Sequence, residues 1–158
     1  SIVPPDRLRR ILTRLFDEKE FLSPYGIRSL SKIYEKNPYS YQQGDDYATI
    51  SYSPADSPVA MFGGNSNWRG PIWMPINYLL IEALQKFGHF FGDDFKMEFP
   101  TGSGRKLNLW QISLELEQRL VGIFRRDADG RRAFNGPVEQ FQQDPLWRDL
   151  FLFNEYFH

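Results

Sequence analysis

Two tryptophans and an arginine stand in a short polar stretch directly before a long apolar run. Trp68, Arg69 and Trp73 lie within residues 63–80, which read GGNSNWRGPIWMPINYLL. The planar guanidinium of Arg69 carries five N–H donors and can bind neighbouring hydroxyl groups in pairs. Tryptophan rings offer flat apolar faces, against which the C–H faces of sugar rings can stack. These residue types suggest a sugar site, but an Arg69 ion pair beside two core tryptophans would explain them equally well.

The apolar period of the sequence predicts four helices. They span residues 4–23, Pro71 or Pro75 to Phe91, about Leu107 to Arg126, and Asp144-Pro145 onward. In the last helix the aspartate would be the N-cap, and the proline would occupy the first turn. The second helix is apolar nearly all round, which is typical of a helix in an interior. We expect this buried helix to carry the Trp68 stretch at its N-terminal end.

The connections between these helices are long and polar. Residues 37–70 show no lasting period, apart from a short extended piece at Tyr47–Ser53. A connection of this length in a compact domain is usually functional. The acid pairs Asp45–Asp46 and Asp93–Asp94 each follow a glycine, and we expect them to serve turns or caps. We expect residues 1–158 to form a single all-α unit with long loops.

The composition excludes several classes of protein. The chain has 158 residues, a formal net charge of −1 and no cysteine, so neither a global cationic field nor disulfide or thiolate chemistry is available. No apolar run is long enough to cross a bilayer. Aromatic residues make up 16% of the chain, with 14 Phe, 8 Tyr and 4 Trp. This share exceeds ordinary packing needs, although an aromatic-rich core is the simpler explanation by itself.

Three segments of the chain resemble motifs of glycoside hydrolase family 63, in the family's order. The segment NWRGPIWMPINYLLIEAL is similar to the YWRGPIW…NYL signature of these processing α-glucosidases and their bacterial relatives. Residues 22–39, LSPYGIRSLSKIYEKNPY, resemble the preceding segment of bacterial members. Residues 152–158, LFNEYFH, resemble the start of the family's Glu-x-aromatic motif. The Trp-Arg-Gly-Pro signature is the most specific of the three.

The resemblance implies a fold and a mechanism. The fold would be a fragment of an (α/α)6 toroid, the C-terminal portion of a larger catalytic domain. The family hydrolyses α-glycosidic bonds with inversion, which requires a carboxylic acid and a carboxylate roughly 6.5–9.5 Å apart. Glu155 aligns with the general base, whereas the aspartate that serves as general acid has no counterpart here. Without the resemblance, Glu155 would be interpreted as an exposed residue of a terminal helix.

The same resemblance gives roles to further residues. Trp68, Arg69, Trp73 and Asn77 are substrate-binding candidates because of their motif positions. Phe153, Tyr156 and Phe157 would shield the Glu155 carboxylate from solvent. The resemblance implies no cofactor and no metal, and it implies a carbohydrate substrate rather than nucleic acid or membrane. A cytoplasmic location is favoured for a bacterial member.

A partial toroid would leave helix flanks uncovered. We therefore expect exposed apolar surface along the second and third helices, and self-association through it.

Two other functions remain open at this point. A non-catalytic carbohydrate-binding domain would use the tryptophans and tyrosines as platforms, and a helical protein-interaction domain would need an apolar face matched to a partner.

Overall fold

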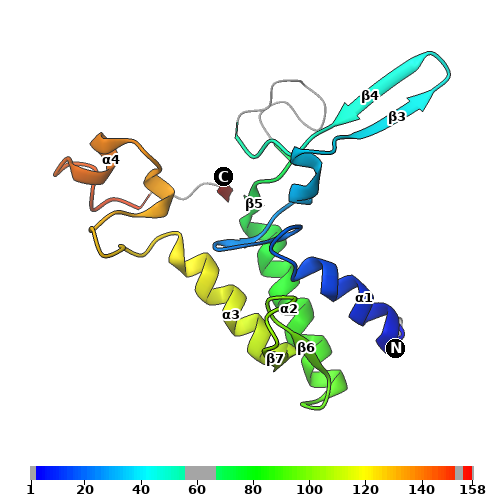
Figure 1. Cartoon of the computed structure of the whole chain (residues 1–158). Coiled ribbons are helices and arrows are strands. Elements are labelled where there is room, and N and C mark those ends of the chain that lie inside the picture. The colour runs from blue at the N-terminus through cyan, green and yellow to red at the C-terminus, as the bar shows by residue number, and fades with distance from the viewer. Residues whose placement is uncertain (1–2, 56–66, 152–154, 158) are drawn as a thin grey trace.

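The chain folds around a central pair of helices, with short β-ribbons at their ends. The computed structural model describes residues 3–55, 67–151 and 155–157. Its helices are α1 (Pro5–Leu15), η1 (Lys32–Glu35), α2 (Met74–Phe91), α3 (Leu109–Gly122), η2 (Ala133–Asn135) and α4 (Glu139–Gln143). Its strands are β1 (Leu22–Ser23), β2 (Gly26–Ile27), β3 (Tyr39–Gln43), β4 (Asp46–Ile50), β5 (Ile72–Trp73), β6 (Lys96–Glu98), β7 (Lys106–Asn108) and β8 (Tyr156–Phe157). Figure 1 shows their arrangement.

The predicted all-α fold, a fragment of an (α/α)6 toroid, is wrong. The described residues combine helices with four two-stranded antiparallel ribbons, β1–β2, β3–β4, β5–β8 and β6–β7. Three of these ribbons join strands that are neighbours in the sequence, within segments interpreted as loops or as the ends of predicted helices. Strands of two to five residues are too short to show a clear period of two, so they are hard to distinguish from loops in a sequence. The chain is a mixed α/β structure.

The core lies between α1, α2, α3 and the β6–β7 ribbon. Phe16 and Phe99 are fully buried at its centre, with ring centroids 5.2 Å apart in an edge-to-face arrangement. The buried core residues are Leu8, Leu12, Phe16, Leu22, Ile27, Ile81, Leu84, Phe95, Met97, Phe99, Leu109, Ile112 and Leu116. They come mainly from the three predicted helices. The helical period therefore identified the helices of the core, but not β2 and β6, which contribute Ile27 and Met97.

Two glycines define the course of α2. Gly92 ends the helix with a φ of 73°, as predicted from its position after the apolar run. Gly88 faces the start of α3, where a Cβ atom would lie only 3.2 Å from the backbone nitrogen of Trp110. A side chain at this position would push the two helices apart, so the close packing of α2 on α3 favours glycine.

The segment after η1 forms an arm rather than an irregular loop. Strands β3 and β4 pair from Tyr39↔Ile50 to Gln43↔Asp46 and project from the end of the molecule that carries β5 (Figure 1). The predicted extended piece at Tyr47–Ser53 is confirmed in its first part, which is β4. The turn at the tip contains Gly44 with a φ of 60°.

The fourth predicted helix is wrong. Asp144 does act as a cap, because its carboxylate accepts the N–H of Leu146 at 2.8 Å. The backbone after it forms turns instead of a helix, with the N–H groups of Trp147 and Arg148 bonded to the Asp144 carbonyl. The helix of this region, α4, comes earlier and has only five residues. The capping residue therefore begins a turn, which does not continue into a helix because no apolar face packs against the core.

Apolar side chains remain exposed on the two central helices. They are Ile76, Tyr78, Leu79 and Phe90 of α2, and Trp110, Leu114 and Val121 of α3. This exposure agrees with the expectation from the sequence, whereas self-association through it stays a prediction. Among the described residues, no helix is both long and apolar enough to span a membrane.

The turn between β6 and β7 is organised by the carboxylate of Glu98. One oxygen accepts the N–H of Gly102 at 2.9 Å, and the other accepts the N–H of Gly104. The hydrogen bonds from Gly102 and Gly104 lower the pKa of Glu98 below its usual value, and the charge of Lys106 acts in the same direction. A carboxyl group whose pKa is lower in the folded state stabilises the fold at pH values above its unfolded pKa.

We predict that Glu98→Gln lowers the stability of the chain near pH 7 and that this effect fades with acid. The contribution of the wild-type carboxylate is lost as the pH falls through its lowered pKa, so the urea midpoints of the two proteins should converge between about pH 7 and about pH 3. Glu35→Gln, at an exposed position of η1, is the matched control and should follow the wild type. A constant gap at every pH would contradict this role of Glu98.

Candidate functional site

The β5–β8 ribbon joins the two motifs that the sequence singled out. Ile72 pairs with Phe157 and Trp73 with Tyr156, in antiparallel register. One step further along the ribbon, the N–H of Met74 donates to the carbonyl oxygen of Glu155 at 2.9 Å. The Trp-Arg-Gly-Pro segment and the Glu-x-aromatic segment, far apart in the sequence, therefore share one backbone ladder. Figure 1 shows β5 directly above the start of α2.

One face of this ribbon carries a stack of three aromatic rings. The rings of Trp68 and Trp73 lie 4.4 Å apart with only 7° between their planes. Tyr156 packs on Trp73 at 4.9 Å with a 38° tilt. Trp73 is 7% exposed, whereas Trp68 is 41% exposed. The stack is therefore anchored inside the molecule and ends in an accessible indole.

The loop before β5 is held by Asn67, which the sequence analysis did not consider. Its side-chain oxygen accepts the N–H of Arg69 at 2.9 Å, and its side-chain nitrogen donates to the carbonyl of Ser53 at 2.5 Å. Its own carbonyl accepts the indole N–H of Trp73 at 2.9 Å. Asn67 thus fixes the orientation of the inner tryptophan and the backbone of Arg69. Its place directly before Trp68 in the motif was the only available signal.

Arg69 is a buried residue of the site. The residue is only 3% exposed, and its carbonyl accepts the N–H of Ser53 at 2.7 Å. Burying a guanidinium is costly unless polar or charged groups surround it, so a buried arginine usually has a specific role. The sequence left two roles open for Arg69, a ligand contact or a structural ion pair. Its burial is compatible with both roles.

Asn77 acts as a clamp between α2 and the β1–β2 ribbon. Its side-chain oxygen accepts the N–H of Ile27 at 2.8 Å, and its side-chain nitrogen donates to the carbonyls of Ile27 at 2.9 Å and Trp73 at 3.0 Å. The residue is 1% exposed. Its amide therefore stabilises the backbone on both sides of the site, while direct contact with a substrate stays a prediction.

A cavity of about 230 Å³ lies at the junction of the two motifs. Gly70 and Ile72 contribute to it from one motif and Phe157 from the other. The other described lining residues are Ser23, Pro24, Tyr25, Arg28, Tyr52 and Pro54. A Cβ atom on Gly70 would lie 2.4 Å from the ring of Tyr52, and the φ of Gly70 is 131°, so this wall requires glycine. Three of the described lining residues, Tyr25, Tyr52 and Phe157, are aromatic, and Arg28 brings a cation to the wall.

The Glu155 side chain is exposed to solvent. Two of its predicted neighbours, Tyr156 and Phe157, lie in β8, whereas Phe153 lies outside the described residues. Phe157 packs edge-to-face on Tyr25, with ring centroids 5.0 Å apart. Aromatic rings therefore follow Glu155 on both faces of the ribbon, but the described rings do not shield its exposed side chain from solvent as expected. The role of its carboxylate remains a prediction.

Three of the four paired acids lie in turns, as predicted, whereas Asp46 is the first residue of β4. Asp45 and Asp46 are at the tip of the β3–β4 arm, and Asp93 and Asp94 follow the end of α2. The Asp93 carboxylate accepts the side-chain N–H of Asn108, the N-cap residue of α3, at 2.6 Å. This turn therefore supports the start of a helix.

The model of the glycosyl hydrolase family 63 C-terminal domain matches residues 2–101, which include the Trp-Arg-Gly-Pro segment and both sides of the Asn77 clamp. The chain belongs to glycoside hydrolase family 63. The match ends before β8, so the contribution of Glu155 to the site depends on the ribbon and on motif similarity.

Three yeast proteins are similar to this chain. Uncharacterized protein YMR196W of Saccharomyces cerevisiae is 50% identical over 159 residues, which cover 99% of this chain and 15% of that protein. A probable mannosyl-oligosaccharide glucosidase of Schizosaccharomyces pombe is 35% identical over 86 residues, 53% of this chain and 8% of that protein. The mannosyl-oligosaccharide glucosidase of Saccharomyces cerevisiae is 32% identical over 82 residues, 51% of this chain and 7% of that protein.

The chain thus spans at most 15% of the length of these relatives. The particular similarity to bacterial members that the sequence suggested stays an expectation, since these relatives are yeast proteins.

We predict that Asn77→Ala destabilises the chain. The substitution leaves the buried N–H and C=O of Ile27 without their side-chain partner, at a cost of about 1–3 kcal/mol for each unsatisfied group. Urea unfolding measures the loss. Asn37→Ala, an exposed position after η1, is the control and should change stability little. If both variants unfold at the wild-type midpoint, Asn77 is not a clamp.

Proposed function

We propose that this chain is part of an inverting α-glycosidase, with Glu155 as the general base. The observation that carries the proposal is the β5–β8 pairing, which brings Glu155 to the segment holding the tryptophan pair and Arg69. In an inverting reaction the base removes a proton from water as that water attacks the anomeric carbon. A carboxylic acid on the opposite side of the bond protonates the leaving oxygen.

The general acid has no counterpart in this chain, so the chain alone is expected to be inactive. The complete protein would supply the acid roughly 6.5–9.5 Å from the Glu155 carboxylate, which leaves room for the attacking water. Membership of family 63 supports hydrolysis of O-glycosidic bonds in α-linked glucosides or related sugars. Two relatives are named mannosyl-oligosaccharide glucosidases, which favours a glucosidic bond on an oligosaccharide.

The sugar itself would be held by aromatic faces and by a cation. The partly exposed Trp68 ring would be the platform for a sugar ring, and its stacking on Trp73 would hold it in place. We assign Arg69 to hydroxyl groups of the substrate or to the catalytic carboxylate. Asn77 would act mainly by holding the backbone around this platform.

A second candidate function is non-catalytic carbohydrate binding. The observation that favours it is the same exposed indole, because a stacked tryptophan can bind a sugar without any carboxylate. The two functions differ in their need for Glu155. Calorimetry would measure oligosaccharide binding to the wild type and to a variant that lacks Glu155. Equal binding by both, together with no turnover of any α-glycoside by the wild type, would favour the second function.

We predict that Glu155→Gln in the complete protein lowers kcat by about 10²- to 10⁴-fold, because the amide cannot take a proton from water. Substrate affinity should change little. The measurement is the release of sugar from an α-glucoside, with NMR of the wild-type product to establish inversion of the anomer. Glu139→Gln, on α4, is the control and should keep wild-type turnover. Undiminished turnover in Glu155→Gln would remove this residue from the mechanism.

We predict that Trp68→Ala weakens substrate binding more than it slows the chemical step. Loss of one stacking face should raise KM about 2- to 10-fold, with a smaller effect on kcat. Trp110→Ala is the matched control, because Trp110 is 51% exposed but lies on α3 outside the site. A KM for Trp68→Ala equal to that of the control would show that the indole is not a platform.

A further inference from the structure

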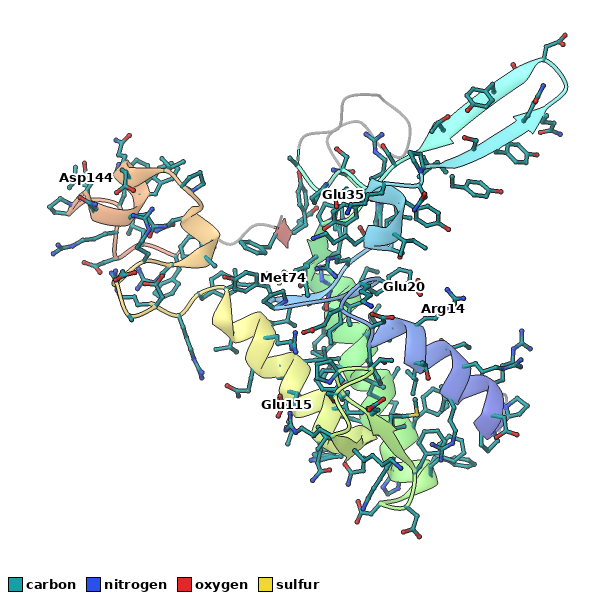
Figure 2. All side chains as sticks on the ribbon, viewed as in Figure 1. Arg14, Glu20, Glu35, Met74, Glu115 and Asp144 are labelled. Atoms are coloured by element: carbon teal, nitrogen blue, oxygen red, sulfur yellow. The ribbon has the colours of Figure 1, made fainter. Side chains whose placement is uncertain are left out.

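The β3–β4 arm exposes tyrosines that the fold does not need. Within the arm, residues 39–50, Tyr39 and Tyr41 are each 50% exposed and Tyr47 is 68% exposed. Figure 2 shows side chains standing on both sides of the arm, away from the helical body. A two-stranded hairpin is marginally stable in water by itself, and exposed aromatic groups in such an element usually mark a binding surface.

The base of the arm forms part of the wall of the cavity at the motif junction. Tyr52, two residues after β4, lines that cavity and lies against Gly70. The next residue, Ser53, donates its N–H to the carbonyl of Arg69 at 2.7 Å. The N–H of Tyr52 donates to the carbonyl of Tyr34 at 3.2 Å. The base of the arm is thus bonded to the candidate site on one side and to η1 on the other.

Aromatic rings continue from this base along one face of the arm. Tyr34 and Tyr39 meet edge-to-face, with ring centroids 6.4 Å apart. Tyr39 and Tyr41 are two residues apart in β3, so their side chains stand on the same face, about 7 Å from each other along the strand. We call Tyr52, Tyr34, Tyr39 and Tyr41 the tyrosine track. Tyr47 pairs with Gln42 on the opposite face, where its hydroxyl donates to Ser40 at 3.0 Å.

The residue types of the arm indicate which class of ligand it can bind. Residues 39–53 contain no Lys, Arg or His, and their only acids, Asp45 and Asp46, are at the tip. A phosphate-rich partner requires cations, which the arm lacks. Apart from Gly44, Ala48 and Ile50, its other residues are Tyr, Ser, Thr and Gln, which offer flat faces and neutral hydrogen-bonding groups. A neutral ligand with many hydroxyl groups fits this surface.

We propose that the tyrosine track binds the body of a neutral oligosaccharide whose terminal sugar is held at the motif junction. Sugar units beyond the terminal one would stack on Tyr39 and Tyr41. This inference rests on the proposed function for the identity of the ligand, and it makes that function selective for long substrates over single glucosides.

The test compares two substrates in the complete protein: a long oligosaccharide with a terminal α-glucose, and the one-sugar substrate nitrophenyl α-glucoside. The double variant Tyr39→Ala/Tyr41→Ala should raise KM for the oligosaccharide about 5- to 50-fold and leave the nitrophenyl substrate unchanged. Tyr47→Ala, on the other face of the same arm, is the matched control and should keep both KM values. Calorimetry of oligosaccharide binding should give the same change in Kd as in KM.

Several outcomes would overturn the proposal. Unchanged KM for both substrates would show that the track does not bind sugar, and equal increases for both would show a structural effect. Protection of Tyr39 and Tyr41 from hydroxyl-radical footprinting, in the complete protein without sugar, would show that other protein covers the arm. If the wild type hydrolyses neither substrate, the glycosidase assignment fails, but the calorimetric comparison of the double variant with Tyr47→Ala still decides the track.

Discussion

The site depends on the backbone pairing of β5 with β8. Within the part of the chain that the structure describes, two residue pairs and one further backbone hydrogen bond, from Met74 to Glu155, join the two segments. The pairing is strengthened by side chains on both faces, with Tyr156 on Trp73 on one face and Phe157 on Tyr25 on the other. Ordering such a distant segment costs chain entropy, so aromatic burial on both faces is an important part of its stability. Without this ribbon, Glu155 would have no fixed relation to the tryptophans.

Much of the helical frame could be predicted from the sequence, because apolar spacing reports directly on burial. The first three predicted helices exist, but α1 ends at Leu15 rather than near Ser23 and α3 ends at Gly122 rather than near Arg126. The second ends at Gly92 as predicted, although it is buried on one side only. Apart from the extended piece that became β4, the ribbons could not be predicted, since strands of two to five residues carry no clear period. The final helix failed because Asp144 and Pro145 give a start signal without an apolar face to hold a helix in place. An all-α interpretation was the result.

The residues of the candidate site were also predicted only in part. Trp68, Trp73 and Arg69 were found from residue type and motif position, and the structure places them in one loop and strand. Asn67 was missed, because its side chain donates to the carbonyls of Ser53 and Ala55, which only the fold brings near. Asn77 was singled out as a substrate ligand, but its bonds to Ile27 could not be foreseen from residues 50 positions away. Polar residues that hold a site look the same in a sequence as residues that bind a ligand.

The register of the β5–β8 ribbon is the most direct test of this account. The chain has no cysteine of its own, so Ile72→Cys and Phe157→Cys would place two thiols opposite each other in a paired position. Cα atoms across such a pair are about 5.5 Å apart, within the range that a disulfide spans. Mild oxidation followed by peptide mass spectrometry should find residues 72 and 157 joined. If both thiols stay free in the folded protein, the two motifs do not meet, and Glu155 does not belong to the site.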